Sequence, residues 1–342
     1  MSGASGGALP LIAVVGPTGS GKSALALALA EHLGTEIVSV DSMQFYRGME
    51  IGTAAPSLAD RARVPHHFVS FLDPGEEMAA GLYQQMARGE VSRIHASGRS
   101  TVAAGGSGMY VSALIDEIFD GPGRDPEVRA RLEDEARTLG NETLLARLRD
   151  VDPDYAANLT SVNDRVRIVR ALEVYELSGR PYSVLHREHR QHAESLPGLQ
   201  FALRYDNRQD LYDRINRRVI QMIDEGWVAE VQSLLDGGQG PHVERLKALG
   251  YREIMAHLEG RQSLDTAIAA SQTDHRRYAK RQLTWFNADP RIHWLPAGTG
   301  IGLDQQLEAL LAAVAVESEP ANGLHRYLQV NVGAASYEGP PQ

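Results

Sequence analysis

The segment at residues 16–23 constrains the fold of this chain more than any other part of the sequence. An apolar run, Leu11–Val15, precedes it, and an alanine- and leucine-rich segment at residues 24–33 follows it. In this setting of strand, glycine-rich turn and helix, the pattern G-x-x-x-x-G-K-[ST] marks a phosphate-binding loop. The sequence therefore predicts an α/β fold, a P-loop NTPase-like parallel sheet flanked by helices. The loop residues expected to bind phosphate are Gly16, Pro17, Thr18, Gly19, Ser20, Gly21, Lys22 and Ser23.

Each part of this loop has a chemical role. The glycines let successive backbone N–H groups point at one spot, where the helix N-terminus offers about half a positive charge to an anion. Lys22 adds a full positive charge on a flexible stem, and the Ser23 hydroxyl can join the ligand shell of a Mg²⁺ ion. We therefore expect a bound phosphate group, with Ser23 as the metal ligand.

Two further strands are expected to end beside the phosphate loop. Residues 36–40 form a short apolar run that ends at Asp41, and residues 101–104 lead into a second glycine-rich segment at 105–110. In open parallel sheets, ligands bind beyond the carboxyl ends of the strands. Both segments should therefore line one pocket with the phosphate loop. Asp41 could hold Mg²⁺ or act as a general base, and the sequence pattern leaves both roles open.

The pattern changes near residue 120, where strands give way to charged, amphipathic segments. We expect a helical insertion at residues 121–197 within an α/β core formed by residues 9–120 and 198–316. Residues 1–8 and 319–342 have the composition of disordered termini. Helices are expected in the insertion at residues 125–139, 141–149, 163–177 and 181–190. In the core, helices are expected at 78–95, 208–224, 228–235, 252–258, 263–287 and 303–316, and strands at 199–205 and 291–295. In the first of these helices, Met78, Leu82, Met86 and Ile94 lie at roughly helical spacing, on a face expected to pack on the sheet.

Composition excludes several kinds of chemistry. The 342 residues include no cysteine, so disulfides, thiolate metal sites and a cysteine nucleophile are excluded. The net charge of −10 argues against indiscriminate nucleic-acid binding, but residues 245–285 carry eight Lys or Arg against four acids. With no signal-like start and no apolar run approaching about 20 residues, a cytoplasmic protein without a membrane segment is expected.

Eight motifs occur in a fixed order along the chain. Together they resemble the bacterial tRNA dimethylallyltransferases, also called tRNA isopentenyltransferases, over about residues 11–295. Ser23 and Ser107 stand where threonine is usual in that family, and each keeps a hydroxyl. The motifs are Gly16-Pro-Thr-x-Ser-Gly-Lys-Ser23, Asp41-Ser-x-Gln-x-Tyr46, Ile51-Gly-Thr-Ala-x-Pro56, Pro65-His-His67, Gly105-Gly-Ser-Gly-Met-Tyr110, Asn163-Asp-x-x-Arg-x-x-Arg-Ala-Leu-Glu173, Gly250-Tyr251 and Lys280-Arg-Gln-x-Thr-Trp285.

The resemblance implies transfer of a dimethylallyl group from its diphosphate to N6 of adenosine 37, in tRNAs that read codons beginning with U. It implies Mg²⁺ as cofactor, the tRNA anticodon stem-loop and dimethylallyl diphosphate as partners, and catalytic roles for Asp41, Lys22, Ser23 and Arg218. We expect a monomer. The residues that the resemblance places against tRNA are Asp41, Ser42, Met43, Gln44, Ser107, Arg129, Val166, Arg167, Ile168, Val169, Arg170, Lys247, Ala248, Leu249, Gly250, Tyr251 and Arg252.

Other functions use the same loop. An adenylate isopentenyltransferase would keep the chemistry and prenylate a free nucleotide, but so small an acceptor would not require the helical insertion. A P-loop kinase would bind ATP instead. A non-catalytic RNA-binding protein would have no use for the intact Lys22, Ser23 and Asp41.

Several residues also have a purely structural interpretation. Arg167 and Arg170 could pair with Asp164 and Glu173 on a solvated helix face. The adjacent pair His66–His67 would point to opposite faces of a strand, which favours a structural loop role over a metal site. Trp285 and Phe286 are expected in the core and not as stacking platforms for bases.

Overall fold

The computed structural model describes residues 11–119, 121–159 and 161–318. In this part of the chain, six parallel strands form one sheet with the order β3-β2-β4-β1-β5-β6, as predicted for a P-loop fold. The two termini predicted to be disordered, 1–8 and 319–342, lie outside the described residues. The strands are β1 (Leu11–Val15), β2 (Ile37–Ser39), β3 (His66–His67), β4 (Thr101–Gly105), β5 (Gly198–Tyr205) and β6 (Ile292–Ala297).

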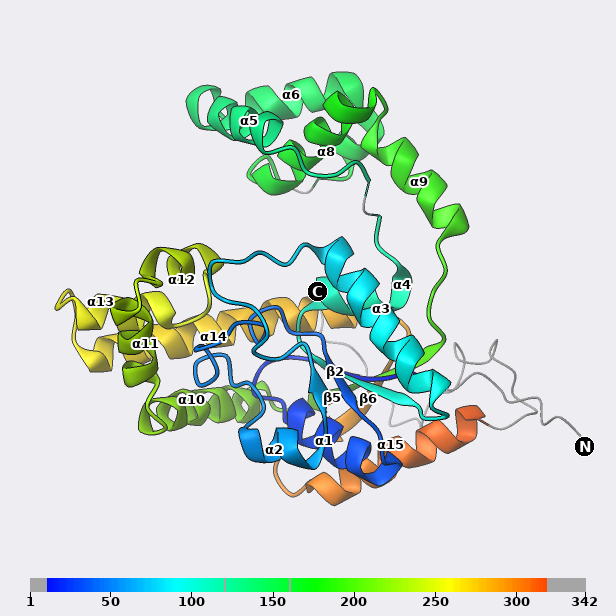
Figure 1. Cartoon of the computed structure of the whole chain (residues 1–342), viewed down its shortest axis with the longest axis vertical. Coiled ribbons are helices and arrows are strands. Elements are labelled where there is room, and N and C mark those ends of the chain that lie inside the picture. Colours follow the sequence, from blue (N-terminus) through cyan, green and yellow to red (C-terminus); the bar gives the residue numbers. More distant parts are fainter. Residues whose placement is uncertain (1–10, 120, 160, 319–342) are drawn as a thin grey trace, which may run out of the picture. The chain divides into compact units, whose positions relative to one another are not determined.

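Helices cover both faces of the sheet (Figure 1). Because side chains alternate along a strand, Ile12 and Val14 of β1 face one layer, formed by α1 (Lys22–Leu33) and α15 (Leu303–Ser318). Leu29 and Leu310 of those helices are fully buried in this core. On the opposite face, α3 (Ala80–Ala96) packs on β2 and β4.

The face that α3 buries differs from the prediction. Spacing suggested that Leu82 and Met86 face the sheet, but these side chains are 47% and 38% exposed. The buried residues of α3 are Tyr83, Ala87, Val91 and Ile94, one helical turn apart. Only Ile94 of the predicted face is in the core.

The predicted long helices of the core are present. Several short elements were not predicted, because they have too few residues to show a period. The longer helices are α10 (Arg208–Asp224), α11 (Trp227–Asp236), α13 (Tyr251–Leu258) and α14 (Leu264–Asn287); the short elements not predicted are α2 (Leu58–Arg63), β3, α4 (Gly108–Asp116), α7 (Pro153–Ala157) and α12 (Gly240–Leu246).

The chain divides into two compact units, with boundaries after Ile115 and after Ser195. The first unit contains the sheet. The second unit, Asp116–Ser195, is helical and has its own core, in which Leu132, Leu148 and Leu172 are fully buried. Its helices are α5 (Pro126–Leu139), α6 (Asn141–Val151), α7, α8 (Arg165–Ser178) and α9 (Tyr182–His192). None of the described helices is long and apolar enough to cross a membrane.

Candidate active site

The phosphate loop connects β1 to α1, and its glycines adopt backbone conformations that other residues rarely do. The φ angles of Gly16, Gly19 and Gly21 are 128°, 76° and 100°. A Cβ atom on Gly19 would also lie 2.7 Å from Cγ1 of Ile215, so a side chain at this position would clash with α10. The tight turn directs the beginning of α1 toward the carboxyl edge of the sheet.

Lys22 at the start of α1 is only 8% exposed, and its Nζ lies 3.3 Å from the carbonyl oxygen of Pro17. Burial lowers the pKa of this ammonium to about 8, the nearby Asp41 carboxylate opposes the shift, and Arg218 adds to it. Lys22 is therefore a desolvated cation close to a second cation.

The second cation comes from α10. Burial also lowers the pKa of Arg218, while Asp41 opposes that shift and the neighbouring Arg214 adds to it. Arg214 donates from Nε to the carbonyl oxygen of Gly19 at 3.0 Å, and this bond connects α10 to the phosphate loop. Three cations with one carboxylate among them leave an excess of positive charge, which is the electrostatic requirement for binding an anion.

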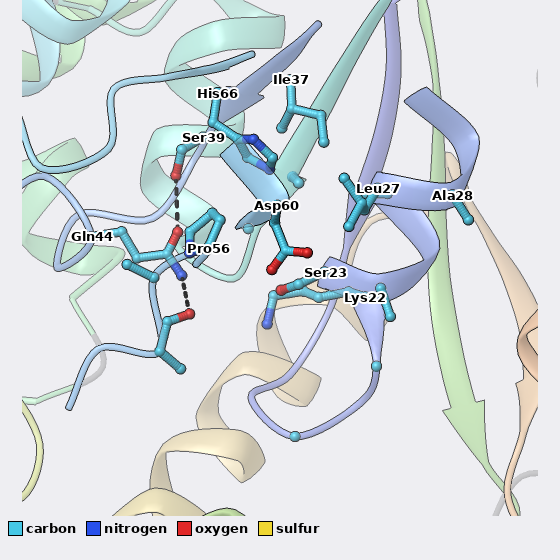
Figure 2. A pocket seen from close by; sticks show the side chains of 18 of the residues that line it. Lys22, Ser23, Leu27, Ala28, Ile37, Ser39, Gln44, Pro56, Asp60 and His66 are labelled. Atoms are coloured by element: carbon cyan, nitrogen blue, oxygen red, sulfur yellow. Dashed lines mark hydrogen bonds between the residues drawn. The ribbon is translucent and has the colours of Figure 1, made fainter. Parts of the chain in front are cut away.

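Asp41 and its neighbours form the opposite wall, just after β2. One oxygen of Asp41 accepts a hydrogen bond from the Met43 backbone N–H at 3.1 Å. Gln44 is fixed at both ends: its Oε1 lies 3.3 Å from the Ser39 hydroxyl and its Nε2 donates to the Ala54 carbonyl oxygen at 3.1 Å (Figure 2). The Ser42 hydroxyl lies 3.2 Å from that of Ser107, in the second glycine loop.

Two cavities meet these residues. One has a volume of about 770 Å³ and the other about 240 Å³. Lys22, Ser23, Gln44 and Arg218 line both, and Figure 2 shows Lys22, Ser23 and Gln44 around the larger cavity. The larger cavity also contacts Gly19, Gly21, Arg214, Arg217 and Gln221; the smaller contacts Thr18, Asp41, Ser42, Met43, Gly52, Thr53, Lys247, Ala248, Leu249, His275, Tyr278, Arg281 and Gln282.

The structure thus brings many of the predicted residues of the first unit to these two cavities. Those that line neither cavity are Gly16, Pro17, Ser20, Ser107, Gly250, Tyr251 and Arg252. Tyr251 is 1% exposed, and its hydroxyl contacts the Met49 carbonyl and Glu230, so it is a packing residue and not a direct tRNA contact. The backbone N–H of Thr18 donates to Gln282 Oε1 at 2.8 Å, which removes it from the set of phosphate donors. Gly250 is buried beside Tyr251, and Arg252 is exposed on α13, outside both cavities.

In the helical unit, the predicted segment at residues 166–170 divides between surface and core. Val166 and Arg167 are exposed, and Arg167 lies 3.2 Å from Asp164. Ile168 and Val169 are 0% and 2% exposed, so the expectation that they contact tRNA is wrong: helix periodicity turns them into the core of the unit.

Arg129 and Arg170 in the same unit share one buried partner. Both form ion pairs with Glu173, at 2.6 and 2.8 Å, and the Glu173 side chain is fully buried. Burial raises the pKa of Glu173, but the hydrogen bonds from the two guanidinium groups outweigh it and hold the pKa below its usual value. The expected ion pair between Arg170 and Glu173 is therefore present, with the carboxylate buried and shared with Arg129, and contact of either arginine with tRNA stays a prediction.

Sequence reasoning missed one side of the smaller cavity, which α14 supplies through His275, Tyr278, Arg281 and Gln282. The sequence signal for this side was the motif Lys280-Arg-Gln-x-Thr-Trp285, which contains Arg281 and Gln282. Trp285 is 47% exposed, which contradicts the prediction of a core residue, whereas Phe286 is buried as expected.

The histidine pair lies in a strand and not in the loop that was predicted. His66 and His67 form β3 at the sheet edge. His67 lies between two glutamates, with Nε2 2.7 Å from Glu36 and Nδ1 3.3 Å from Glu90. Arg93 and Arg99 also pair with Glu36, so these carboxylates already have cationic partners.

Comparison with known proteins identifies relatives over most of the chain. The family model described as IPP transferase matches residues 44–289. A tRNA dimethylallyltransferase of Syntrophobacter fumaroxidans is 46% identical over 295 residues, which cover 86% of this chain and 86% of that protein. One of Geobacter sulfurreducens is 46% identical over 295 residues, covering 86% and 94%.

Solved structures give the same result. The full-length tRNA isopentenylpyrophosphate transferase of Bacillus halodurans superimposes with a TM-score of 0.66 at 35% identity, over 93% of this chain and 97% of that one. A eukaryotic dimethylallyltransferase acting on tRNA has a TM-score of 0.76 at 24% identity, over 90% and 79%, and supports the fold alone.

Proposed function

The chain belongs to the IPP transferase family and is a tRNA dimethylallyltransferase, and we propose that its two cavities hold the donor and the acceptor of that reaction. The observation that supports this arrangement is the set of side chains common to both cavities, Lys22, Ser23, Gln44 and Arg218. A prenyl donor in the larger cavity and the acceptor adenosine in the smaller one would meet at these residues.

The donor end binds the diphosphate. The backbone of Gly19, Gly21, Lys22 and Ser23, the Lys22 ammonium and the Arg218 guanidinium would supply hydrogen bonds and positive charge to an anion at the start of α1. These groups bind a diphosphate more tightly as it leaves, because its negative charge grows when the bond to carbon breaks. No nucleotide hydrolysis is required.

The acceptor end holds the adenosine with Asp41 beside its amine. The lone pair of N6 attacks C1 of the dimethylallyl group, the C1–O bond breaks with its electrons passing to the diphosphate, and the N6 proton passes to the Asp41 carboxylate. The hydrogen bond from the Met43 N–H fixes one Asp41 oxygen and leaves the other for this proton. Ser42 and Ser107, whose hydroxyls lie 3.2 Å apart, position the adenine ring.

A magnesium ion fits the donor set at this place. Ser23 and Asp41 both line the smaller cavity and offer hard oxygen ligands, which Mg²⁺ prefers, together with phosphate oxygens of the substrate. When bound, the ion would neutralise charge on the departing diphosphate. Ser23 would hold the ion, while Asp41 would serve as its ligand, as the base, or as both in turn.

The helical unit is proposed to bind the anticodon stem-loop, with Arg167 exposed on α8 for contact with its backbone. Adenosine 37 of tRNAs that read codons beginning with U is the proposed target. It must leave its stack to reach Asp41, at a cost of a few kcal/mol that is lower in a loop than in a duplex. We also propose that the enzyme acts as a monomer, because one chain carries both cavities. Its place of action is proposed to be the cytoplasm, because its acceptor is tRNA.

The experiment uses labelled dimethylallyl diphosphate with unmodified tRNA. We expect label on N6 of one adenosine, a loss of about 100-fold or more in kcat for Asp41→Ala, and pyrophosphate binding by that variant within a few-fold of the parent. Asp73→Ala is the control, since Asp73 is an exposed carboxylate paired with Arg47 outside both cavities. Label on AMP and none on tRNA would favour an adenylate isopentenyltransferase, and near-normal turnover by Asp41→Ala would remove its role as base.

A further inference from the structure

Gln282 on α14 joins the two glycine-rich loops of the site. Its side chain is 5% exposed, its Oε1 accepts the backbone N–H of Thr18 at 2.8 Å, and its Nε2 donates to the carbonyl oxygen of Gly106 at 2.8 Å. Thr18 belongs to the loop after β1 and Gly106 to the loop after β4. Those strands are neighbours in the sheet, with Val15 opposite Gly105. One amide therefore connects the two loops where they leave adjacent strands.

The close contact between α14 and the second glycine-rich loop leaves no room for a side chain at Gly106 or at Gly108. A Cβ atom on Gly106 would lie 2.2 Å from Gln282 Nε2, and one on Gly108 would lie 2.3 Å from Nε1 of Trp285. These glycines are therefore required by the close approach of α14. The contact also accounts for two motifs that lie far apart in the sequence, the glycine segment at 105–110 and the segment at 280–285.

The bond to Thr18 organises the phosphate loop. It fixes the loop at Thr18 by using that N–H, and the following residues Gly19, Gly21, Lys22 and Ser23 line the donor cavity. The bond to Gly106 fixes the residue before Ser107, whose hydroxyl lies 3.2 Å from Ser42, the neighbour of Asp41. A continuous series of contacts therefore runs from the diphosphate loop through Gln282 to the segment that carries Asp41, the proposed general base.

We propose that Gln282 is a positioning residue for the transfer reaction, and that it sets the separation between the diphosphate loop and the loop that carries Ser107. This inference rests on the proposed function of the two cavities. Gln282 does this by using its amide as acceptor and donor at once. Glutamate would keep the acceptor for Thr18 but place a carboxylate oxygen against the Gly106 carbonyl, and methionine would keep the volume and lose both bonds.

The test compares Gln282→Met and Gln282→Glu with Gln272→Met. Gln272 lies on the same helix, makes one hydrogen bond to the Asn216 carbonyl oxygen at 3.2 Å, and lines neither cavity. We expect both Gln282 variants to lower kcat at saturating substrates by about 10- to 100-fold, since small misplacements of reacting groups have effects of this size. Pyrophosphate Kd and the KM for tRNA should change by less than about threefold, and Gln272→Met should keep the parent kcat.

A kcat within about twofold of the parent for the two Gln282 variants would overturn the proposal. So would a loss of kcat matched by an equal loss of pyrophosphate affinity and of folded protein, because that pattern describes a structural role. Should Gln282→Met not fold, the near-isosteric Gln282→Glu variant decides between these outcomes. The parent enzyme, assayed in parallel for transfer to tRNA, reports on the proposed function independently of Gln282.

Discussion

At the scale of single residues, Lys22 is the side chain whose state depends most on what occupies the site. Its ammonium is buried near Arg218, and Asp41 is the carboxylate that opposes the resulting fall in its pKa. A bound diphosphate would add negative charge next to it and favour the charged form. Burial of the Lys22 ammonium therefore destabilises the protein without ligand but strengthens its binding of the anion.

The first prediction concerns the pH dependence of this binding. Because the pKa of Lys22 is lowered to about 8 in the free protein and rises when an anion binds, affinity for pyrophosphate should fall as pH increases through 8. Between pH 7 and 9 the part due to Lys22 should approach tenfold. Isothermal titration calorimetry in buffers of different ionisation enthalpy would measure the accompanying proton uptake. Lys22→Arg is the control, because arginine stays charged throughout this range; parallel profiles for the two proteins would contradict the prediction.

The second prediction separates RNA contact from folding in the helical unit. Arg167→Ala should raise the KM for tRNA and reduce the slope of log affinity against log salt by about one, with little effect on the donor, because one phosphate contact is lost. Arg187→Ala is a matched control, since Arg187 is similarly exposed and paired, with Asp154, in the same unit. Equal effects of the two substitutions would show that Arg167 has no special role.

Arg170 cannot be used in the same way. Its removal would leave the buried Glu173 with Arg129 as its remaining cationic partner. Loss of one partner of a buried pair is strongly destabilising, so a loss of RNA binding by Arg170→Ala would not be distinguished from partial unfolding.

How far the sequence predicted the site depends on the residue. Lys22 and Asp41 could be placed together because both follow parallel strands, and the carboxyl ends of such strands share one edge. Tyr278 and Gln282 could not, since helical spacing shows which face of α14 is apolar but not which loops that face contacts. Ile168 was misassigned because a motif names neighbouring residues without separating those that face the core.

At the scale of elements, the edge of the sheet is held by charge. Glu36 beside β2 is 7% exposed and bonds to His67 of β3 and to Arg93 and Arg99. Burial alone would raise the pKa of Glu36, but the hydrogen bonds from His67, Arg99 and Arg93 outweigh it and lower the pKa to about 2. The two-residue strand β3 has few backbone bonds of its own, so this cluster fixes its position.

The third prediction follows from that shift. A carboxyl with a lowered pKa in the folded state adds stability above its unfolded pKa, and the gain is lost as pH falls from about 4.5 through about 2. Glu36→Gln should therefore lower the free energy of unfolding at pH 7 by up to about 3 kcal/mol, from about 1.4 kcal/mol per pKa unit. The difference between variant and parent in urea unfolding should shrink steadily between pH 5 and 3. A difference that does not depend on pH would contradict the assignment.

The error in α3 has a physical cause at the same scale. One face of this helix carries Leu82 and Met86 at helical spacing, and a second face carries Tyr83, Ala87 and Val91 at the same spacing. The structure buries the other face because the Tyr83 ring packs on Phe45 and Tyr110, at centroid distances of 5.5 and 4.8 Å, and its hydroxyl donates to the Ser39 carbonyl oxygen. These partners lie in other elements, so spacing within the helix could not identify the face.

At the scale of the whole molecule, the insertion interrupts the core without separating its ends. The backbone N–H of Leu196, where the chain returns, donates to the carbonyl oxygen of Ile115, where it leaves, at 2.8 Å. The helical unit also has its own core, in which Leu144 and Leu172 are fully buried. The family resemblance seen in the motifs is confirmed by the comparisons, whereas the binding role of this unit stays a prediction.

The last prediction uses that geometry to test the role. Replacing residues 116–195 with a short glycine–serine linker should leave the first unit folded, because the two ends are already within hydrogen-bond distance and its sheet and cavities contain no residue of the insertion. The shortened chain should bind pyrophosphate within about threefold of the parent. Its KM for tRNA should rise by about 100-fold or more, since several phosphate contacts would be lost and each contributes to affinity at physiological salt.

Two linker lengths control for strain at the junction. If the shortened chain prenylates tRNA as well as the parent does, the insertion is not the tRNA-binding unit; if it prenylates AMP better than tRNA, the insertion is what selects the larger acceptor.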